Sequence, residues 1–224
     1  MSASAPPLAT IEAAFRAFVA EPGFSCLAGK GVMRSGRYQL GVYGSLGSQR
    51  STRELARDLA EFVAAPEPDD AAFRSMIAVF PGRVPRDEID FEQKLWAQLQ
   101  ALHERDEPEN EWDPAVTDDP NDPHFAFSFA GSGLFVIGLH PRSSRLARRF
   151  RWPALVFNPH VQFEHLRDAG RYERLRNVVR EREIALQGSL NPNLADFGEQ
   201  SEARQYSGRA VEKHWECPFH RKDP

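Results

Sequence analysis

Two strand patterns in the middle of the chain constrain the fold more than any other feature. Residues 124–130 alternate phenylalanine with small side chains, the period-two pattern of a half-buried strand. Residues 134–140 (LFVIGLH) are almost wholly apolar, which indicates a strand buried on both faces. Because only the short turn 131–133 separates the two segments, they predict a hairpin.

Helical and strand patterns surround this hairpin. Apolar residues at helical spacing predict helices over 8–20, from Ser51 onward, over 87–104 and from Tyr172 to Leu186. Further strands are expected at 38–46, 73–80 and 154–157. Hairpin strands with helices clustered around them predict an α+β fold, with a mainly antiparallel sheet and helices packed around it.

The segment after the last expected strand carries helix-start signals. Asn158 is a favoured N-cap and Pro159 would take the first helical position. Gly170 would close this short helix. A short basic helix is also expected over 144–150, whereas 107–123, acidic and rich in proline, predicts an exposed loop that could cover a site.

Length and composition set the broad class. A chain of 224 residues suits one domain, and we treat 1–224 as a single domain. The net charge of −4 gives no electrostatic case for nucleic acid as a partner. No apolar run suits a membrane and no signal peptide is evident, so a cytoplasmic protein with reduced cysteines is expected. A homodimer is compatible with this class.

Histidines are the first candidate ligands. His160 would lie at the start of the helix after Asn158, on one face with Phe163, Glu164 and Arg167. An imidazole fixed there could bind a metal or a heme iron, or it could simply bond locally. His140, at the end of the apolar strand, is the second candidate ligand, and His124 could face the same end of the sheet.

Two polar clusters offer binding groups. Five arginines form either a solvated face or a site for carboxylates and phosphates, because guanidinium groups bind such anions bidentately. The irregular segment 188–209 carries acids and arginines that either pack as a polar loop or bind a ligand. The arginines are Arg142, Arg145, Arg148, Arg149 and Arg151, and the second set is Asp196, Glu199, Glu202, Arg204, Tyr206 and Arg209.

Several common motifs are absent from the sequence. Gly29-Lys30-Gly31 lacks the spacing of a phosphate-binding loop, and there is no CxxC, HExxH or GxSxG pattern. A zinc hydrolase or a serine hydrolase is therefore unsupported. Cys26 could supply a thiolate ligand or could be a buried structural thiol.

Four blocks of sequence resemble the YqcI/YcgG family in the same order. They are FAFSFAGSGLFVIGLHPRSSRLARRF (125–150), LVFNPHVQFEHLR (155–167), GSLNPNLADFGEQSEARQYSGR (188–209) and WECPFH (215–220). The segment Phe24-Ser25-Cys26 with Gly29-Lys30 is a weaker likeness to it. That family includes heme proteins of the guanitoxin and cycloserine pathways, which hydroxylate a nitrogen of arginine-like amino acids.

The resemblance implies a heme-dependent N-hydroxylase that uses a non-covalent heme b, O2 and an external electron donor or redox partner. It implies histidine ligation of the iron, by His160 with His140 in reserve, while Arg145, Arg149 and Phe163 would contact the cofactor. An amino-acid-like substrate, most simply an arginine-like one, would meet Glu199, Glu202 and Arg204. Asp196 and Arg209 are further candidates for its charged groups.

Two other hypotheses about the function remain open. A heme-binding carrier or gas sensor would use the same histidine without turnover. A heme-free interaction domain would use the arginine cluster to dock a partner.

Overall fold

The centre of the molecule is one five-stranded sheet with the spatial order β1-β2-β5-β4-β3. The computed structural model describes residues 6–66 and 73–221. β1 and β2 are parallel, and every other neighbouring pair is antiparallel. The expected α+β fold with a mainly antiparallel sheet is confirmed. The strands are β1 (Tyr38–Val42), β2 (Ser75–Val79), β3 (Phe127–Phe129), β4 (Ser132–Leu139) and β5 (Ala154–Pro159).

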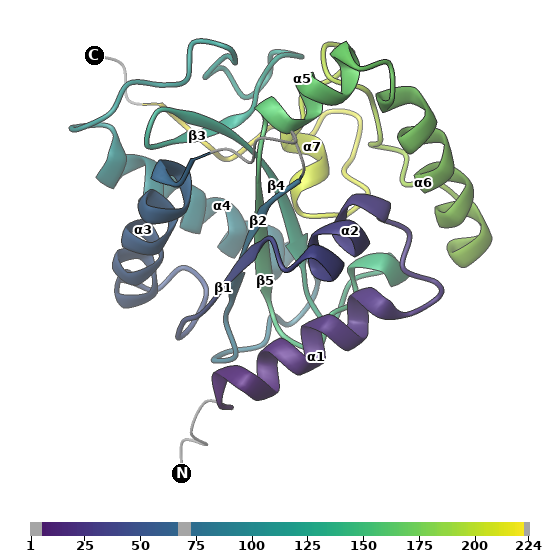
Figure 1. Ribbon diagram of the computed structural model, residues 1–224. Helices are drawn as coiled ribbons and strands as arrows, with labels where there is room; N and C mark the ends of the chain where they lie inside the picture. Colours follow the sequence, from purple (N-terminus) through teal and green to yellow (C-terminus); the bar gives the residue numbers. More distant parts are fainter. Residues whose placement is uncertain (1–5, 67–72, 222–224) are drawn as a thin grey trace.

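Helices cover both faces of the sheet (Figure 1). α3 (Gln49–Ala64), which also makes the crossover between the parallel strands β1 and β2, packs with α4 (Glu88–Asp106) on one face. α1 (Leu8–Ala20) and α2 (Leu27–Ser35) cover the other face. The remaining helices follow β5 in the chain: α5 (Val161–Asp168), α6 (Tyr172–Gln187) and the short α7 (Ala203–Tyr206).

Strand alternation divides the core into two parts. Leu134 and Val136 of β4 and Phe157 of β5 point toward α3 and α4, where they join the larger hydrophobic cluster. Ile137 of β4 and Val156 of β5 point the opposite way, toward α1 and α2. Alternate residues along these strands therefore pack on opposite faces of the sheet.

The central hairpin forms with its turn one residue earlier than expected. Ala130 and Gly131 make the turn, with φ of 51° and 72°, and Ser132 already belongs to β4. Two successive positive φ values are the requirement of a type I′ turn, whose twist suits a hairpin.

The chain after β5 also differs from the expectation. Asn158 and Pro159 are the last residues of β5 rather than the start of a helix, and the Asn158 side chain bonds Ser75 and the carbonyl of Phe135. His160 is thus the N-cap of α5, without a side-chain cap bond. Ladder pairing with β4 outcompetes the local capping signal.

Three smaller differences concern helices. α2 occupies the segment around Gly29 and Gly31, where no helix was expected. The short basic helix expected over 144–150 is a 3₁₀ turn at Leu146–Arg148. α3 begins at Gln49, where Ser48 caps it by accepting from the Ser51 amide.

None of the helices within 6–66 and 73–221 has the length and apolar character needed to cross a bilayer.

Candidate functional site

A cavity of about 290 Å³ lies on the sheet face that α1 and α2 cover. Its floor is apolar and comes from three neighbouring strands, because Val156 pairs with Ile77 on one side and with Ile137 on the other. Asn158 and Phe135 extend this floor toward the end of β5. The volume falls near the lower end of the range for small-molecule sites.

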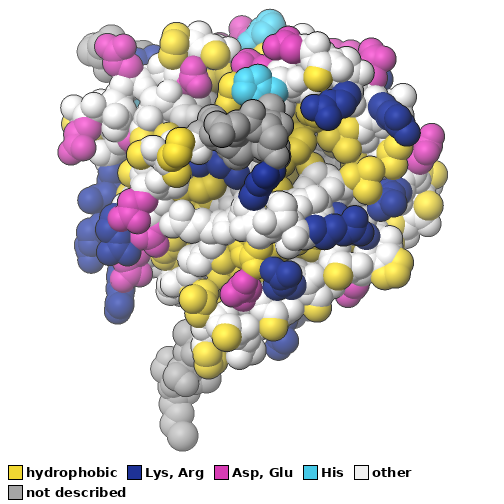
Figure 2. Space-filling model, viewed as in Figure 1, with side chains coloured by type: hydrophobic (Ala, Val, Ile, Leu, Met, Phe, Trp, Pro, Cys, Tyr) yellow, Lys and Arg dark blue, Asp and Glu magenta, His cyan; other side chains and the backbone are white. Residues whose placement is uncertain are grey.

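The walls come from segments far apart in the sequence. α1 and α2 contribute Val19, Cys26 and Met33, while α5 and α6 contribute Phe163 and Leu175. Residues 191–205 complete the enclosure. In Figure 2 hydrophobic side chains, with Lys and Arg side chains among them, are visible in the region between α2 and α6.

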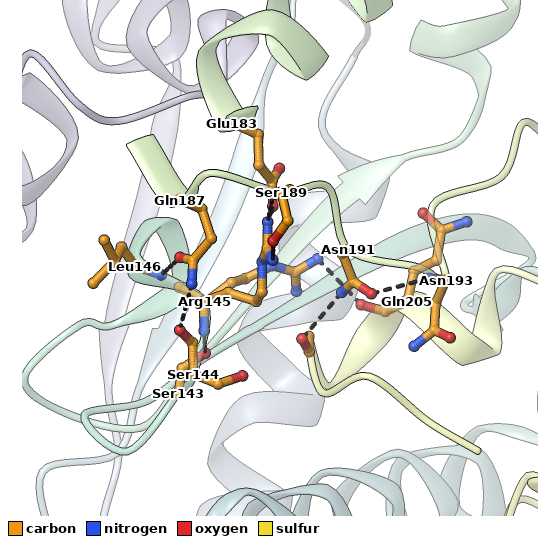
Figure 3. A network of polar contacts seen from close by, with 12 residues as sticks. Ser143, Ser144, Arg145, Leu146, Glu183, Gln187, Ser189, Asn191, Asn193 and Gln205 are labelled. Carbon is orange, nitrogen blue, oxygen red and sulfur yellow. Dashed lines mark hydrogen bonds and ion pairs between the residues drawn. The ribbon is translucent and has the colours of Figure 1, made fainter. Parts of the chain in front are cut away.

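A polar network fixes one wall of the cavity (Figure 3). Arg145 donates to the Glu183 carboxylate at 2.6 Å and to the carbonyl of Ser189 at 2.5 Å. Asn191 donates to the carbonyl of Gly208 at 3.1 Å. The Arg145 guanidinium is therefore held by protein partners, and its ion pair with Glu183 ties α6 to the segment after β4.

Arg148 is the guanidinium without a carboxylate partner on this wall. Its nitrogens donate to the backbone carbonyls of Gly138, Gln205 and Tyr206, at 3.1 to 3.2 Å. Within the described residues it forms no ion pair. Burial lowers the pKa of Arg148 to about 10, so the group remains a cation at neutral pH.

A second set of charges lies next to this network, because Arg176 and Arg180 belong to α6, as Glu183 does. Asp196 pairs with Arg176 and, at 3.4 Å, with Arg180. Arg167 lies 4.7 Å from the ring centre of Tyr172 and 5.3 Å from that of Phe197, and no carboxylate pairs with it among the described residues. All of these residues line the cavity. The cavity thus combines an apolar floor with cations that an anionic group could reach.

Among the described acids that line this cavity, Glu202 is the one that no arginine pairs with, since Glu183 pairs with Arg145 and Asp196 pairs with Arg176 and Arg180. Its side chain is 8% exposed, and within the described part of the chain its Oε2 atom has no hydrogen-bond partner. Burial raises the pKa of the Glu202 carboxyl above its usual range, and His160 opposes this shift. A buried carboxylate with a free oxygen is suited to a cation or to a proton donor in a ligand.

His160 lies directly behind Glu202 rather than in the cavity wall. Its Nε2 atom is 3.6 Å from Oε1 of Glu202, and its Nδ1 atom is 3.6 Å from Oε1 of Glu164. The ring, with its side chain 2% exposed, contacts Phe197 at 4.5 Å between ring centres. The expected grouping of His160 and Glu164 on one face is therefore present, but the cavity lining does not include the imidazole.

His140 is on the far side of the sheet from the cavity. It follows Gly138 on the face that packs against α4, and its ring stacks on Phe91 at 4.2 Å between centres. Neither ring nitrogen has a hydrogen-bond partner among the described residues, and burial lowers the pKa of His140 to about 4. His140 therefore lies just past the end of β4, whereas His160 bonds the carbonyl of Gly133 near the start of that strand.

The other expected site residues divide in the same way. Arg145 and Phe163 line the cavity, whereas Arg149 donates to the carbonyl of Ser143 outside it. Glu199 is exposed and accepts from the backbone amide of Asp196. Arg204 points away, toward the Trp215 ring and the carbonyl of Glu212.

Three further expectations concern groups outside the lining. Arg209 pairs with Glu92 at 2.8 Å, on the α4 side. His124 is 62% exposed at its side chain and contacts Asp122. The loop 107–123 is mostly exposed, as expected, and its Asp113 accepts from the amide of Gly133 on the hairpin, so it does not cover this cavity.

Cys26 is the thiol that lines the cavity. It is the N-cap of α2, and its sulfur accepts from the Gly29 amide at 3.3 Å. Burial raises the pKa of this thiol, while Arg148 and the helix amides oppose the shift. In the sequence, Cys26 is marked only by the weak family likeness of Phe24-Ser25-Cys26. That likeness gives no reason to prefer Cys26 over a histidine as the ligand.

The residues of the cavity fit a heme in three respects. The sheet floor is apolar, Arg148 and Arg167 have no carboxylate partner among the described residues and could meet propionates, and Cys26 and Met33 bring sulfur atoms to the lining. The lining thus presents a thiol and a thioether, with His160 one side chain further back. Within the described residues, no three His, Cys, Asp or Glu side chains gather as a cage for a free metal ion.

The fold and site together define a class: an α+β protein with a largely apolar, partly open cavity on one face of its sheet. The chain belongs to the YqcI/YcgG family, whose family model matches residues 15–220. It is 26% identical over 208 residues to the uncharacterized protein YcgG of Bacillus subtilis (strain 168), covering 88% of this chain and 80% of that protein. It is 25% identical over 211 residues to the uncharacterized protein YqcI of the same strain, covering 89% and 81%. No solved structure matches the chain significantly.

Proposed function

We propose that this protein is a heme-dependent enzyme that N-hydroxylates a small amino-acid-like substrate in the cavity, using O2 and an external electron donor. The observation that carries the proposal is the charge pattern of the cavity. One buried acid, Glu202, faces an apolar space that also holds arginines without carboxylate partners, Arg148 and Arg167. That pattern complements a molecule with a cationic nitrogen and a carboxylate.

The chain's own residues would divide the work as follows. Ionised Glu202 holds the cationic nitrogen of the substrate, and an unpaired arginine holds its carboxylate. The apolar floor would exclude water, and Cys26 would be a candidate donor for the cofactor. A bound heme would supply the oxygen chemistry, which is the cofactor's own.

An absorption spectrum tests the cofactor part of this proposal. Heme-reconstituted wild type should show a strong Soret band, and the ferrous carbon monoxide complex should be of the thiolate type. Cys26→Ala should lose or change these bands, whereas His160→Gln should retain them. Loss of the bands in His160→Gln, but not in Cys26→Ala, would establish histidine ligation, and no band at all would contradict heme binding.

Turnover separates the enzyme from a heme carrier or gas sensor. L-Arginine and other amino acids, incubated with the reduced protein and O2, should gain one oxygen by mass spectrometry. Glu202→Gln should abolish this gain while leaving the heme spectrum intact, because it removes the charge that holds the cationic nitrogen. A carrier would show no oxygen gain in either protein.

A further inference from the structure

The segment 141–151, between β4 and β5, carries positive charge alone. It has five arginines and no acidic residue, although the net charge of the whole chain is −4. Two of the arginines, Arg145 and Arg148, line the cavity. The three that are exposed on the outside are Arg142, Arg149 and Arg151. The same short segment therefore forms a wall of the cavity and a cationic patch on the protein surface.

Two exposed apolar side chains lie beside these arginines. Leu146, in the 3₁₀ turn, is 38% exposed, and Ile184 of α6 is 48% exposed. The two elements are in contact, because Gln187, one turn after Ile184, accepts from the Leu146 amide. In Figure 3 the Leu146 side chain points away from Arg145 and Glu183, which line the cavity. An apolar centre beside exposed arginines is a composition typical of protein–protein interfaces.

The charge of the surrounding segments has the same sign. The segments 8–37, 141–151 and 161–187, which form the helices and the wall around the cavity, carry 15 of the 28 Lys and Arg residues. They carry only seven of the 32 Asp and Glu residues, so the rest of the chain is strongly acidic. A negatively charged molecule is therefore attracted to this side of the protein and repelled from the other parts.

We propose that the surface centred on Leu146 and Ile184, and bordered by Arg142, Arg149 and Arg151, docks a small acidic electron-carrier protein. The inference rests on the proposed function, because N-hydroxylation consumes two electrons and two protons for each O2. One oxygen atom enters the new N–O bond, and the other leaves as water. The carrier is oxidised and O2 is reduced, so a one-electron carrier has to dock twice in each turnover.

Charge, size and position all suit a partner of this kind. Exposed arginines complement an acidic protein and speed its association by electrostatic steering. The small apolar centre fits the small, weak interfaces of electron-transfer complexes, whose partners must separate again after each electron. A carrier docked here is separated from the cavity by the segment 141–151, because Arg145 and Arg148 of that segment line the cavity.

The test uses the full chain reconstituted with heme, with a plant-type [2Fe–2S] ferredoxin and a flavodoxin as acidic carriers. Stopped-flow absorption measures how fast each reduced carrier reduces the heme, and calorimetry measures its binding. The second-order rate constant should fall roughly tenfold when the ionic strength rises from about 20 mM to about 200 mM, because salt screens the steering. Reduction by dithionite, which needs no docked protein, is the reference and should be equally fast in every variant.

Two double variants with the same change in net charge locate the surface. Arg142→Glu with Arg151→Glu should lower the rate constant for the carrier roughly tenfold or more and weaken its binding. Arg53→Glu with Arg105→Glu places the same charges at exposed positions of α3 and α4, on the other face of the sheet, and should have a much smaller effect. Leu146→Ala should weaken binding at high salt as well, because it removes apolar contact area.

The possible outcomes separate the docking surface from the proposed function. Absence of a Soret band after reconstitution would count against the proposed function. If dithionite reduces the heme but neither carrier binds, or if both double variants lose the same amount, the docking surface is overturned. Binding to heparin or to phosphatidylserine vesicles, with no binding to either carrier, would assign the surface to another polyanion and would also overturn it.

Discussion

At the scale of single residues, the two histidines that looked equivalent in the sequence have opposite surroundings. His160 lies between two carboxylates beside the cavity, whereas His140 is packed between β4 and α4 with an aromatic ring against it. Burial in the second environment disfavours a protonated imidazole. The same residue type therefore lies beside the cavity at one position and packs in the core at the other.

The burial of His140 predicts an acid sensitivity. Its pKa of about 4 in the folded chain is below the usual 6.5, so below pH 6.5 the unfolded state binds the proton more readily. Stability should be complete above pH 6.5, fall as the pH drops toward 4, and level off below that, a loss of about 3 kcal/mol in total.

Urea unfolding of His140→Phe measures this contribution. The variant keeps a ring against Phe91 and cannot take up the proton, so it should match the wild type near neutral pH and exceed it in acid. His165→Phe, at an exposed position, is the matched control and should leave the pH dependence unchanged. A wild-type acid profile in His140→Phe would contradict this account.

At the scale of elements, α2 shows where sequence patterns fail. Gly29 and Gly31 lower its intrinsic helix propensity, so the segment looks like a turn. The helix forms because Cys26 caps its start, Gly36 closes its end with φ of 70°, and Val32 and Met33 are buried against the sheet. Tertiary packing, rather than intrinsic helix propensity, therefore determines that this segment is helical.

The two glycines of α2 should respond differently to alanine. A Cβ on Gly31 would have no neighbour within 4 Å, so Gly31→Ala should stabilise the protein by about 1 kcal/mol through helix propensity alone. A Cβ on Gly29 would lie 3.3 Å from Phe24 and 3.6 Å from the Cys26 sulfur, so Gly29→Ala should gain less or lose stability. Thermal unfolding of both variants checks the order, and equal effects would refute it.

The hairpin and the main helices were predictable because periodicity reports burial directly. The same signal could not show which face of the sheet has the cavity, so it could not separate His160 from His140. Nor could it sort the irregular segment 191–205, where Glu202 faces the cavity while Glu199 and Arg204 do not. A segment without a repeat gives no rule for side-chain direction, and long-range packing alone decides it.

At the scale of the whole molecule, the sheet separates a packed side from a side with a cavity. On the packed side, Phe219 is fully buried among aromatic rings, including Trp112 at 5.9 Å and His103 at 5.3 Å between centres. Gln100 holds the adjacent backbone by accepting from the His220 amide and donating to its carbonyl. A residue far along the chain is thus a central part of the core.

Truncation of this side chain should be costly. Phe219→Ala should lower the free energy of unfolding by about 3–5 kcal/mol, the usual range for a buried phenylalanine. His220→Ala is the control, because the neighbouring side chain is exposed and only its backbone is bonded. Urea denaturation of both proteins gives the comparison, and a loss below 1 kcal/mol for Phe219→Ala would show that the segment is dispensable.

The position of Phe219 also bears on how the protein is synthesised. Every strand and helix of the described residues precedes Phe219 in the chain, so all of these elements leave the ribosome before it does. Until then the aromatic cluster that includes Trp96 and Phe125 lacks its central ring and presents an open apolar surface. The native core therefore closes only after this segment has been synthesised, and a nascent chain stalled before it would be a natural client for chaperones.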